Sequence, residues 1–339
     1  MSKFRLGALY PEHLSRYFCI ESGQAESRFR ELAAVCLAEG RPEIAQGFLC
    51  CSVWEKYGRH VYEVGPAMAD LLSSVPLTDV PYEHVVWPYE AFYVYLPDCT
   101  WPLWGGPSGW HPCSGAVVFH EHPEATSSQE FGIFGWGPPN PKSKDPGDDT
   151  FVWMPFSREA AWGGDLEWKS DHRKDDPIIT SFPPDGKLLQ LETENKLARL
   201  VVNLLLYLGS RDPDLLLQPP VAFEKASEDV SRTGNPKKKA RRLQAALETP
   251  SVVTTVVGRS YEGLLRHRTA GSGSRQAPRA HWRRAHWNTY WMGPRTDEHG
   301  NPIQQHRELK LITAGVVAGS KPERNLLQEH GPVHRHIVR

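Results

Sequence analysis

The residues best suited to do chemistry lie in one segment, residues 279–293, which has the sequence RAHWRRAHWNTYWMG. It holds three Trp, one Tyr, two His and three Arg, and it has no acidic residue. Arg offers a planar fork of donors that matches phosphate groups. Trp and Tyr offer flat faces for bases or for the side chains of a partner. The segment therefore predicts a surface that contacts a polyanion.

The same segment could support cleavage of a phosphodiester without a metal. If residues 280–291 form a strand, alternate side chains share a face, so Arg284, His286 and Tyr290 lie together and His281 lies on the opposite face. A His could take the 2′-hydroxyl proton, a Tyr could donate a proton, and an Arg could stabilise the charged phosphate. These four residues are candidate catalytic residues of a ribonuclease. The alternatives are that the His and Arg residues only bind phosphate, or that the Trp side chains anchor a hairpin to the core.

Charge is divided unevenly along the chain. Residues 1–230 contain 19 Lys and Arg against 33 Asp and Glu, whereas residues 231–295 contain 14 against two. A basic block beside an acidic body indicates that the block binds a polyanion; the alternative is that the two parts pair with each other. The candidate nucleic-acid-binding side chains are Lys237, Lys238, Lys239, Arg241, Arg242, Arg266, Arg268, Arg279, Arg283, Trp287 and Trp291.

Composition and motifs exclude several classes of protein. The six Cys residues are scattered and form no Cys-x-x-Cys pair, so neither a disulfide scaffold nor a zinc site is expected. His120 and His122 have no evident third ligand, so we predict no metal and no cofactor. Phosphate-binding Gly-rich loops and the Gly-x-Ser-x-Gly motif of hydrolases are absent from the sequence. The longest apolar run, residues 200–208, is interrupted by Asn203 and is too short to cross a bilayer, so we expect a soluble cytoplasmic protein without a membrane partner.

The elements that position the Trp-rich segment follow from the spacing of apolar residues. Helical spacing predicts helices at residues 26–39, 42–57 and 66–72, and one long helix at residues 184–209. Alternating aromatic and β-branched residues predict an antiparallel meander with strands at Phe92–Leu96, Gly115–His120, Phe131–Trp136 and Phe151–Phe156. Further strands are expected at Val252–Val257, Ala280–Trp291 and Glu308–Val317, with a Gly300–Asn301 turn joining the last two as a hairpin.

These elements define an α+β fold with N-terminal helices, a central antiparallel sheet packed on a long helix, and basic C-terminal antiparallel strands. We expect four regions, namely an N-terminal helical region (1–80), an α+β body (81–224), a basic connector (225–249) and a basic β region (250–339). Three Trp residues of the body are expected to be exposed and to contact a peptide: Trp101, Trp104 and Trp110.

The Trp-rich segment, from His281 to Gly293, resembles a family of type V-A anti-CRISPR proteins that lower the mRNA of the effector nuclease in a translation-dependent way. The similarity continues through the strand around Lys310 to Val316-Val317-Ala318, and it includes Val257-Gly258-Arg259-Ser-Tyr261-Glu-Gly263. Weaker similarity is found at Phe92–Asp98, Leu204–Leu208 and Asp212-Pro213-Asp214.

The resemblance implies a phage- or plasmid-borne protein that recognises the N-terminal segment of a nascent effector and causes loss of its message. The expected partners are a nascent protein segment, such as the N-terminus of a type V CRISPR effector, and RNA or the ribosome. Two mechanisms stay open. The protein could cut the message itself, or it could be an RNA- or ribosome-binding adaptor without catalytic activity that recruits a host nuclease. A third possibility is an RNA-binding protein with no protein target.

Overall fold

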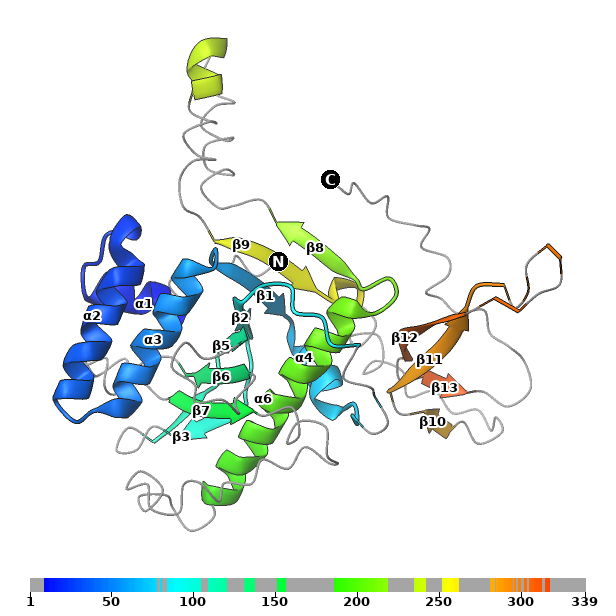
Figure 1. Cartoon of the computed structure of the whole chain (residues 1–339). Coiled ribbons are helices and arrows are strands. Elements are labelled where there is room, and N and C mark those ends of the chain that lie inside the picture. Colours follow the sequence, from blue (N-terminus) through cyan, green and yellow to red (C-terminus); the bar gives the residue numbers. More distant parts are fainter. Residues whose placement is uncertain are drawn as a thin grey trace.

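A seven-stranded mixed sheet lies at the centre of the computed structural model, between two layers of helices (Figure 1). In chain order its strands are β1 (His60–Val64), β2 (Ala91–Tyr95), β5 (Gly115–His120), β6 (Phe131–Trp136), β7 (Phe151–Phe156), β8 (Leu215–Gln218) and β9 (Val253–Val257). Their order across the sheet is β7-β6-β5-β2-β1-β9-β8. The structure describes residues 9–77, 80, 84–104, 109–120, 131–137, 151–156, 186–218, 235–241, 252–261, 281–283, 285–294, 296, 298, 299, 302, 303, 305–312 and 315–317.

One half of the sheet is the predicted antiparallel meander. Strands β2, β5, β6 and β7 pair antiparallel in sequence order, and β5, β6 and β7 have the predicted bounds. The other half differs, because β1 pairs in parallel with both β2 and β9. The predicted antiparallel sheet is thus confirmed for the meander, and β1, which was not predicted, makes the sheet as a whole mixed. The five residues of β1 were expected within a helical region, since so short a strand between two helices gives little alternation to detect.

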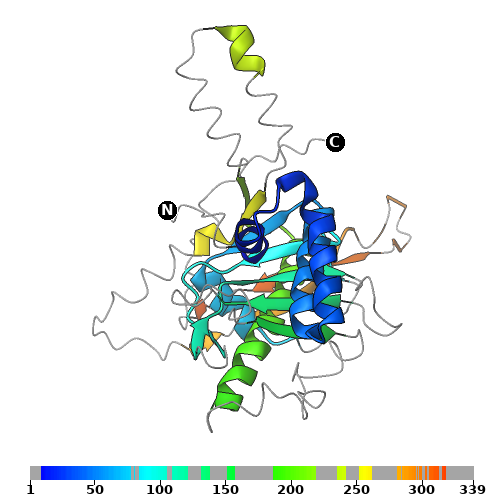
Figure 2. The same cartoon turned by 90° about the vertical axis from the view of Figure 1, so that its left-hand side faces the viewer.

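Helices cover both faces of the sheet, so its central strands are buried on both sides. On one face lie α1 (Tyr10–Tyr17), α2 (Ala25–Ala38) and α3 (Pro42–Lys56), preceded at α2 by the short 3-10 turn η2 (Ser22–Gln24). On the other lie α4 (Pro66–Ser74) and the long helix α6 (Gly186–Gly209), as Figures 1 and 2 show. Alternation along β2 divides its side chains between two cores, with Phe92 facing α4 and α6 and Tyr93 facing α1–α3. Among the described helices, none combines the length and apolar character needed to cross a membrane.

Three small antiparallel pairs make up the other sheets of the described residues. They are β3 (Pro102–Trp104) with β4 (Trp110–Pro112), β10 (His281–Arg283) with β13 (Gly315–Val317), and β11 (His286–Met292) with β12 (His306–Ile312). The strand expected at residues 280–291 is thus broken before β11, where Ala285 is buried. The strand expected at residues 308–317 is divided in the same way between β12 and β13. The Gly300–Asn301 turn lies outside the described residues.

A buried charge cluster ties the N-terminal helices to the start of β1. The Arg59 guanidinium forms ion pairs with Glu12 of α1 and with Glu55 of α3, and its Cζ lies 5.5 Å from the ring centroid of Trp54. Two carboxylates therefore share one cation. Burial raises the pKa of Glu55 to about 7, and the nearby carboxylate of Glu26 adds to the rise.

The contribution of Glu55 to the stability of the protein should fall as the pH rises from about 4.5 to about 7. The folded chain holds the Glu55 proton up to about pH 7, whereas the unfolded chain releases it near 4.5, so ionisation in this range favours unfolding. At about 1.4 kcal/mol per pH unit the full loss is on the order of 3 kcal/mol. Urea unfolding at about pH 5 and about pH 8 measures how much unfolding free energy is lost between the two pH values. We expect a smaller loss for Glu55→Gln than for the wild type, whereas the exposed Glu31→Gln should lose as much as the wild type. Equal losses in Glu55→Gln and the wild type would contradict this account.

Candidate nucleic-acid interface

The C-terminal hairpin, formed by β11 and β12, has an inner face that packs on the core. Across the pair, Trp287 lies opposite Leu311 and Thr289 lies opposite Leu309. Both leucines are buried in the hydrophobic cluster that includes α4 and α6, and Trp287 packs against that cluster. Because side chains alternate along a strand, fixing this face directs the other one outward.

A single buried amide anchors the hairpin. The Nε1 of Trp287 donates a hydrogen bond to Oδ1 of Asn203 on α6, at 2.7 Å. The Nδ2 of Asn203 donates to the carbonyls of Leu72 and Val75, at 2.8 and 3.1 Å, where α4 ends. Asn203 has no exposed surface. The structure shows the indole of Trp287 as an anchor to the core, which is the alternative that the sequence left open, and its binding to nucleic acid stays a prediction.

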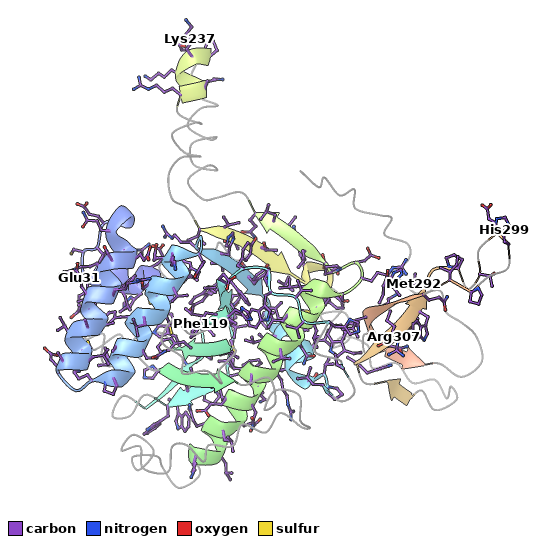
Figure 3. All side chains as sticks on the ribbon, in the orientation of Figure 1. Glu31, Phe119, Lys237, Met292, His299 and Arg307 are labelled. Carbon is purple, nitrogen blue, oxygen red and sulfur yellow. The ribbon has the colours of Figure 1, made fainter. Side chains whose placement is uncertain are left out.

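The end of the hairpin that projects from the body carries exposed aromatic and cationic side chains. Trp291 is 58 % exposed and Tyr290 is 41 % exposed. Arg307 lies opposite Trp291 across the hairpin, with its Cζ 4.3 Å from the indole centroid, a cation–π contact. Figure 3 labels Arg307 on this hairpin. Lys310 is exposed and lies opposite Asn288. This arrangement presents a flat ring and two cations at the surface.

Glu308 is the one acidic residue of β11 and β12, and its charge is already engaged. Its carboxylate lies 3.0 Å from Nε2 of His306 and 3.7 Å from Nε of Arg211, in the segment that follows α6. The backbone N–H of Arg211 also donates to the carbonyl of Leu309, at 3.1 Å. Among the described residues, neither Arg307 nor Lys310 has a carboxylate within ion-pair distance. The outer end of the hairpin therefore carries excess positive charge that suits a phosphate backbone.

The predicted catalytic set is not brought together within the described residues. His286 and Tyr290 share a face, as expected, but they are four positions apart along the strand, a distance of about 13 Å. Proton transfer needs both groups within hydrogen-bond reach of the reacting atoms. His281 belongs to β10, in a different sheet from His286, and its side chain lies outside the described structure, as does all of Arg284.

The side chains that β12 contributes next to Tyr290 were not predicted from the sequence. Glu308 lies directly opposite Tyr290, and His306 lies one residue pair further along the same face. The signal was the two-residue alternation of HRELKL, which separates His306, Glu308 and Lys310 from the inward leucines. Lys310 was named only through the resemblance to the anti-CRISPR family.

The basic connector contains a short helix at residues 236–241. Asn235 caps it, because its Oδ1 accepts hydrogen bonds from the backbone N–H groups of Lys237 and Lys238, at 3.0 and 3.3 Å. Lys237 and Lys238 are exposed, as is Arg241, and Lys239 is half-buried. Four other predicted cations lie outside the described residues (Arg242, Arg266, Arg268 and Arg279), and the same holds for the side chain of Arg283.

The three Trp residues expected to contact a peptide lie in different environments. Trp101 is 7 % exposed and packs in the core below α4 and α6, so the expectation that it is exposed is wrong. Trp104 and Trp110 are half-buried and face each other across β3 and β4, with ring centroids 5.1 Å apart. The backbone N–H of Trp104 donates to Oε1 of Gln190 on α6, at 2.9 Å. Turn-rich flanks gave all three the same appearance in the sequence.

The described residues contain no group of three or more His, Cys, Asp or Glu side chains arranged to hold a metal. His120 instead contacts the body of the protein. Its Nδ1 lies 3.7 Å from Oε2 of Glu90, and its ring lies 4.7 Å from that of Trp87. Its predicted neighbour His122 lies outside the described residues.

Fold and hairpin together define a mixed-sheet α+β protein with exposed aromatic and cationic side chains on its C-terminal hairpin. Residues 62–319 match the AcrVA2-like family, described as the anti-CRISPR type V subtype A2 family. The chain belongs to this family, and its role is to counter CRISPR defence. The resemblance seen in the sequence is thereby confirmed.

A crystal structure of AcrVA2 is similar to this chain, with 15% sequence identity and a TM-score of 0.45, over 87% of this chain and 86% of that one. No curated protein matches the chain.

Replacing the anchoring amide should loosen the hairpin. Asn203→Leu leaves two carbonyls of α4 and the indole N–H of Trp287 without their partner, and each such group costs about 1–3 kcal/mol. We expect the free energy of unfolding to fall by about 3 kcal/mol or more in urea. Trp287→Phe should lower the free energy of unfolding by less, about 1–2 kcal/mol, because it leaves only the Asn203 oxygen without a partner. The exposed Trp291→Phe is the control and should stay within about 0.5 kcal/mol of the wild type. An Asn203→Leu protein as stable as the wild type would refute the anchor.

Proposed function

We propose that this anti-CRISPR protein recognises the N-terminal segment of a type V effector nuclease as it leaves the ribosome, and that it promotes loss of the effector mRNA. The observation that carries the RNA part of the proposal is the outer end of the C-terminal hairpin. There an exposed indole is stacked with a guanidinium on a ribbon that the core holds in place. Membership of the type V subtype A2 family supports the choice of effector class.

The chemistry of this surface fits single-stranded RNA. Unpaired bases stack on exposed aromatic rings, and each stacked base contributes about 1–3 kcal/mol of binding free energy. Trp291 and Tyr290 offer such rings, and Arg307 can pair with a phosphate while it remains over the indole. The exposed lysines of the connector helix supply further cations. None of these contacts reads sequence, so specificity for one message would come from the nascent chain.

A binding role suits this geometry better than direct cleavage. An adaptor that recruits a host nuclease needs no assembled acid–base pair, and the separation of His286 from Tyr290 is no obstacle to it. A metal-independent ribonuclease remains the second candidate, and one observation favours it. His306 is held by the Glu308 carboxylate at 3.0 Å on the face that carries Tyr290, so a base and a proton donor lie on neighbouring strands.

For the peptide, the half-buried pair of Trp104 and Trp110 is one candidate contact. Its rings are held at the surface of β3 and β4, and α6 fixes the backbone of Trp104 through Gln190. Aromatic rings with polar edges are frequent anchors in protein interfaces.

Affinity for a single-stranded RNA should depend on the exposed end of the hairpin. Trp291→Ala should weaken binding about tenfold or more, because it removes a stacking surface. Arg307→Ala should also reduce the dependence of affinity on salt, with the log–log slope falling by about 0.7 for each lost phosphate contact. Fluorescence anisotropy at several salt concentrations measures both effects. Lys56→Ala, at an exposed cation on α3, serves as the control. Binding that does not respond to salt would argue against RNA.

Message loss in cells that translate the effector separates the adaptor from the nuclease. For an adaptor, His286→Ala and His306→Ala should leave the loss of effector mRNA unchanged, whereas Trp291→Ala should reduce it. For a nuclease, purified protein should cut the RNA, and one of the two His variants should abolish cutting while RNA binding stays within about twofold of the wild type. Quantification of the message, with an untranslated copy of the same gene as control, distinguishes these results.

A further inference from the structure

The open edge of the seven-stranded sheet is a short strand of leucines. Strand β8 is last in the sheet, and within the described structure it pairs only with β9. Leu215, Leu216 and Leu217 are 39 %, 39 % and 66 % exposed. Edge strands of soluble proteins usually carry charged residues or Pro that discourage pairing with another chain. Three exposed leucines on an edge therefore suggest a contact surface.

The apolar side chains lie on both faces of this edge. Leu215 and Leu217 are opposite Val257 and Thr255, on the face that α4 and α6 cover elsewhere in the sheet. Leu216 is opposite Val256, on the other face. A strand added at this edge would thus meet apolar side chains above and below its backbone.

The edge is held firmly before any partner arrives. The backbone N–H of Asp214, just before β8, donates to the hydroxyl of Tyr207 on α6, at 2.8 Å, and its carbonyl accepts from Gly258. Oδ2 of Asp214 accepts from the backbone N–H and the hydroxyl of Ser260, at 2.7 and 2.6 Å. These bonds fix the start of β8 against the end of β9, so little order remains to be gained on binding.

The row of outward backbone groups identifies the chemistry of the partner. Along an edge strand, N–H and C=O groups alternate at strand spacing, and an extended polypeptide is the ligand that matches them. A nucleic-acid backbone does not alternate donors and acceptors at strand spacing, and its charged phosphates do not suit leucines. A second copy of this chain is a poor fit, since four residues bury far less than the roughly 800 Å² per partner of a stable interface.

We propose that β8 binds an extended, apolar segment of the nascent polypeptide by taking it up as an added strand. The identity of the peptide as a nascent effector rests on the function proposed above, whereas the docking edge rests on β8 itself. The bound segment should carry apolar residues at consecutive positions, because leucines flank both of its faces, and it should have no Pro where its N–H groups pair.

The test uses the full-length protein and a fluorescent synthetic peptide that covers the N-terminal segment of a type V effector. Leu217→Lys and Leu216→Lys should each weaken peptide binding about tenfold or more, because burying the added charge at a pairing edge opposes docking. Both should leave RNA affinity and thermal unfolding unchanged. The matched control is Leu188→Lys, at a 74 % exposed leucine near the start of α6, which should bind the peptide as the wild type does. Hydrogen exchange at residues 215–218 should slow when the peptide is added.

Other results would overturn the proposal in separable ways. If both β8 variants bind the peptide as well as the wild type does, the β8 edge is not the binding site, although the proposed function survives. Loss of binding in Trp110→Ala would then identify the pair of Trp104 and Trp110 as the site. If the wild type binds no effector peptide, both ideas fail. Slow exchange across β8 in the free protein would mean that another segment of this chain covers the edge. A change of oligomeric state in Leu217→Lys would mean that a second copy does.

Discussion

The buried amide of Asn203 is the interaction on which the outward-facing part of the molecule depends. An amide without partners in an apolar core would destabilise the fold, and here all its described bonds reach other elements. It joins the end of α4, the middle of α6 and the inner face of the C-terminal hairpin. The same residue that interrupts the apolar run of α6 in the sequence therefore determines how the hairpin stands on the body. With the Trp287 face held on the body, Tyr290 on the opposite face points outward, and Trp291, which shares the face of Trp287, is exposed further along the hairpin.

Much of the fold could be predicted because most of its core elements carry strong patterns. Strands β5, β6 and β7 and the helix α6 are bounded by Gly and Pro, and their apolar residues recur with clear periods. Strands β1 and β8 were not predicted. The first is a short strand enclosed by helices, and the three leucines of the second resemble the end of the helix before them. Pairing between strands distant in sequence, such as β1 with β9, has no local signature at all.

The candidate site shows why residue type alone was insufficient. Trp101, Trp287 and Trp291 are chemically identical, yet the first is buried in the core, the second anchors a hairpin and the third is exposed. Alternation along a strand predicts which side chains share a face but not which face meets the core. Two segments that resemble the anti-CRISPR family, residues 257–263 and, more weakly, residues 212–214, lie far apart in sequence. In the structure Asp214 bonds directly to Ser260, so the two segments form one local unit.

The short segment between α6 and β8 has a consequence for how partners would be sensed. Residues 210–214 connect the helix to the leucine edge, and within them Arg211 bonds to β12 while Asp214 bonds to the end of β9. The spacing between edge and hairpin is thereby set by a few bonded residues rather than by a flexible tether. Under the function proposed above, a free peptide would occupy only the β8 edge and a free RNA only the hairpin. Under the same proposal, a ribosome that exposes a growing chain near its own message would engage both surfaces together. Two binding surfaces at a fixed spacing would then respond to active synthesis of the target rather than to free peptide or free RNA.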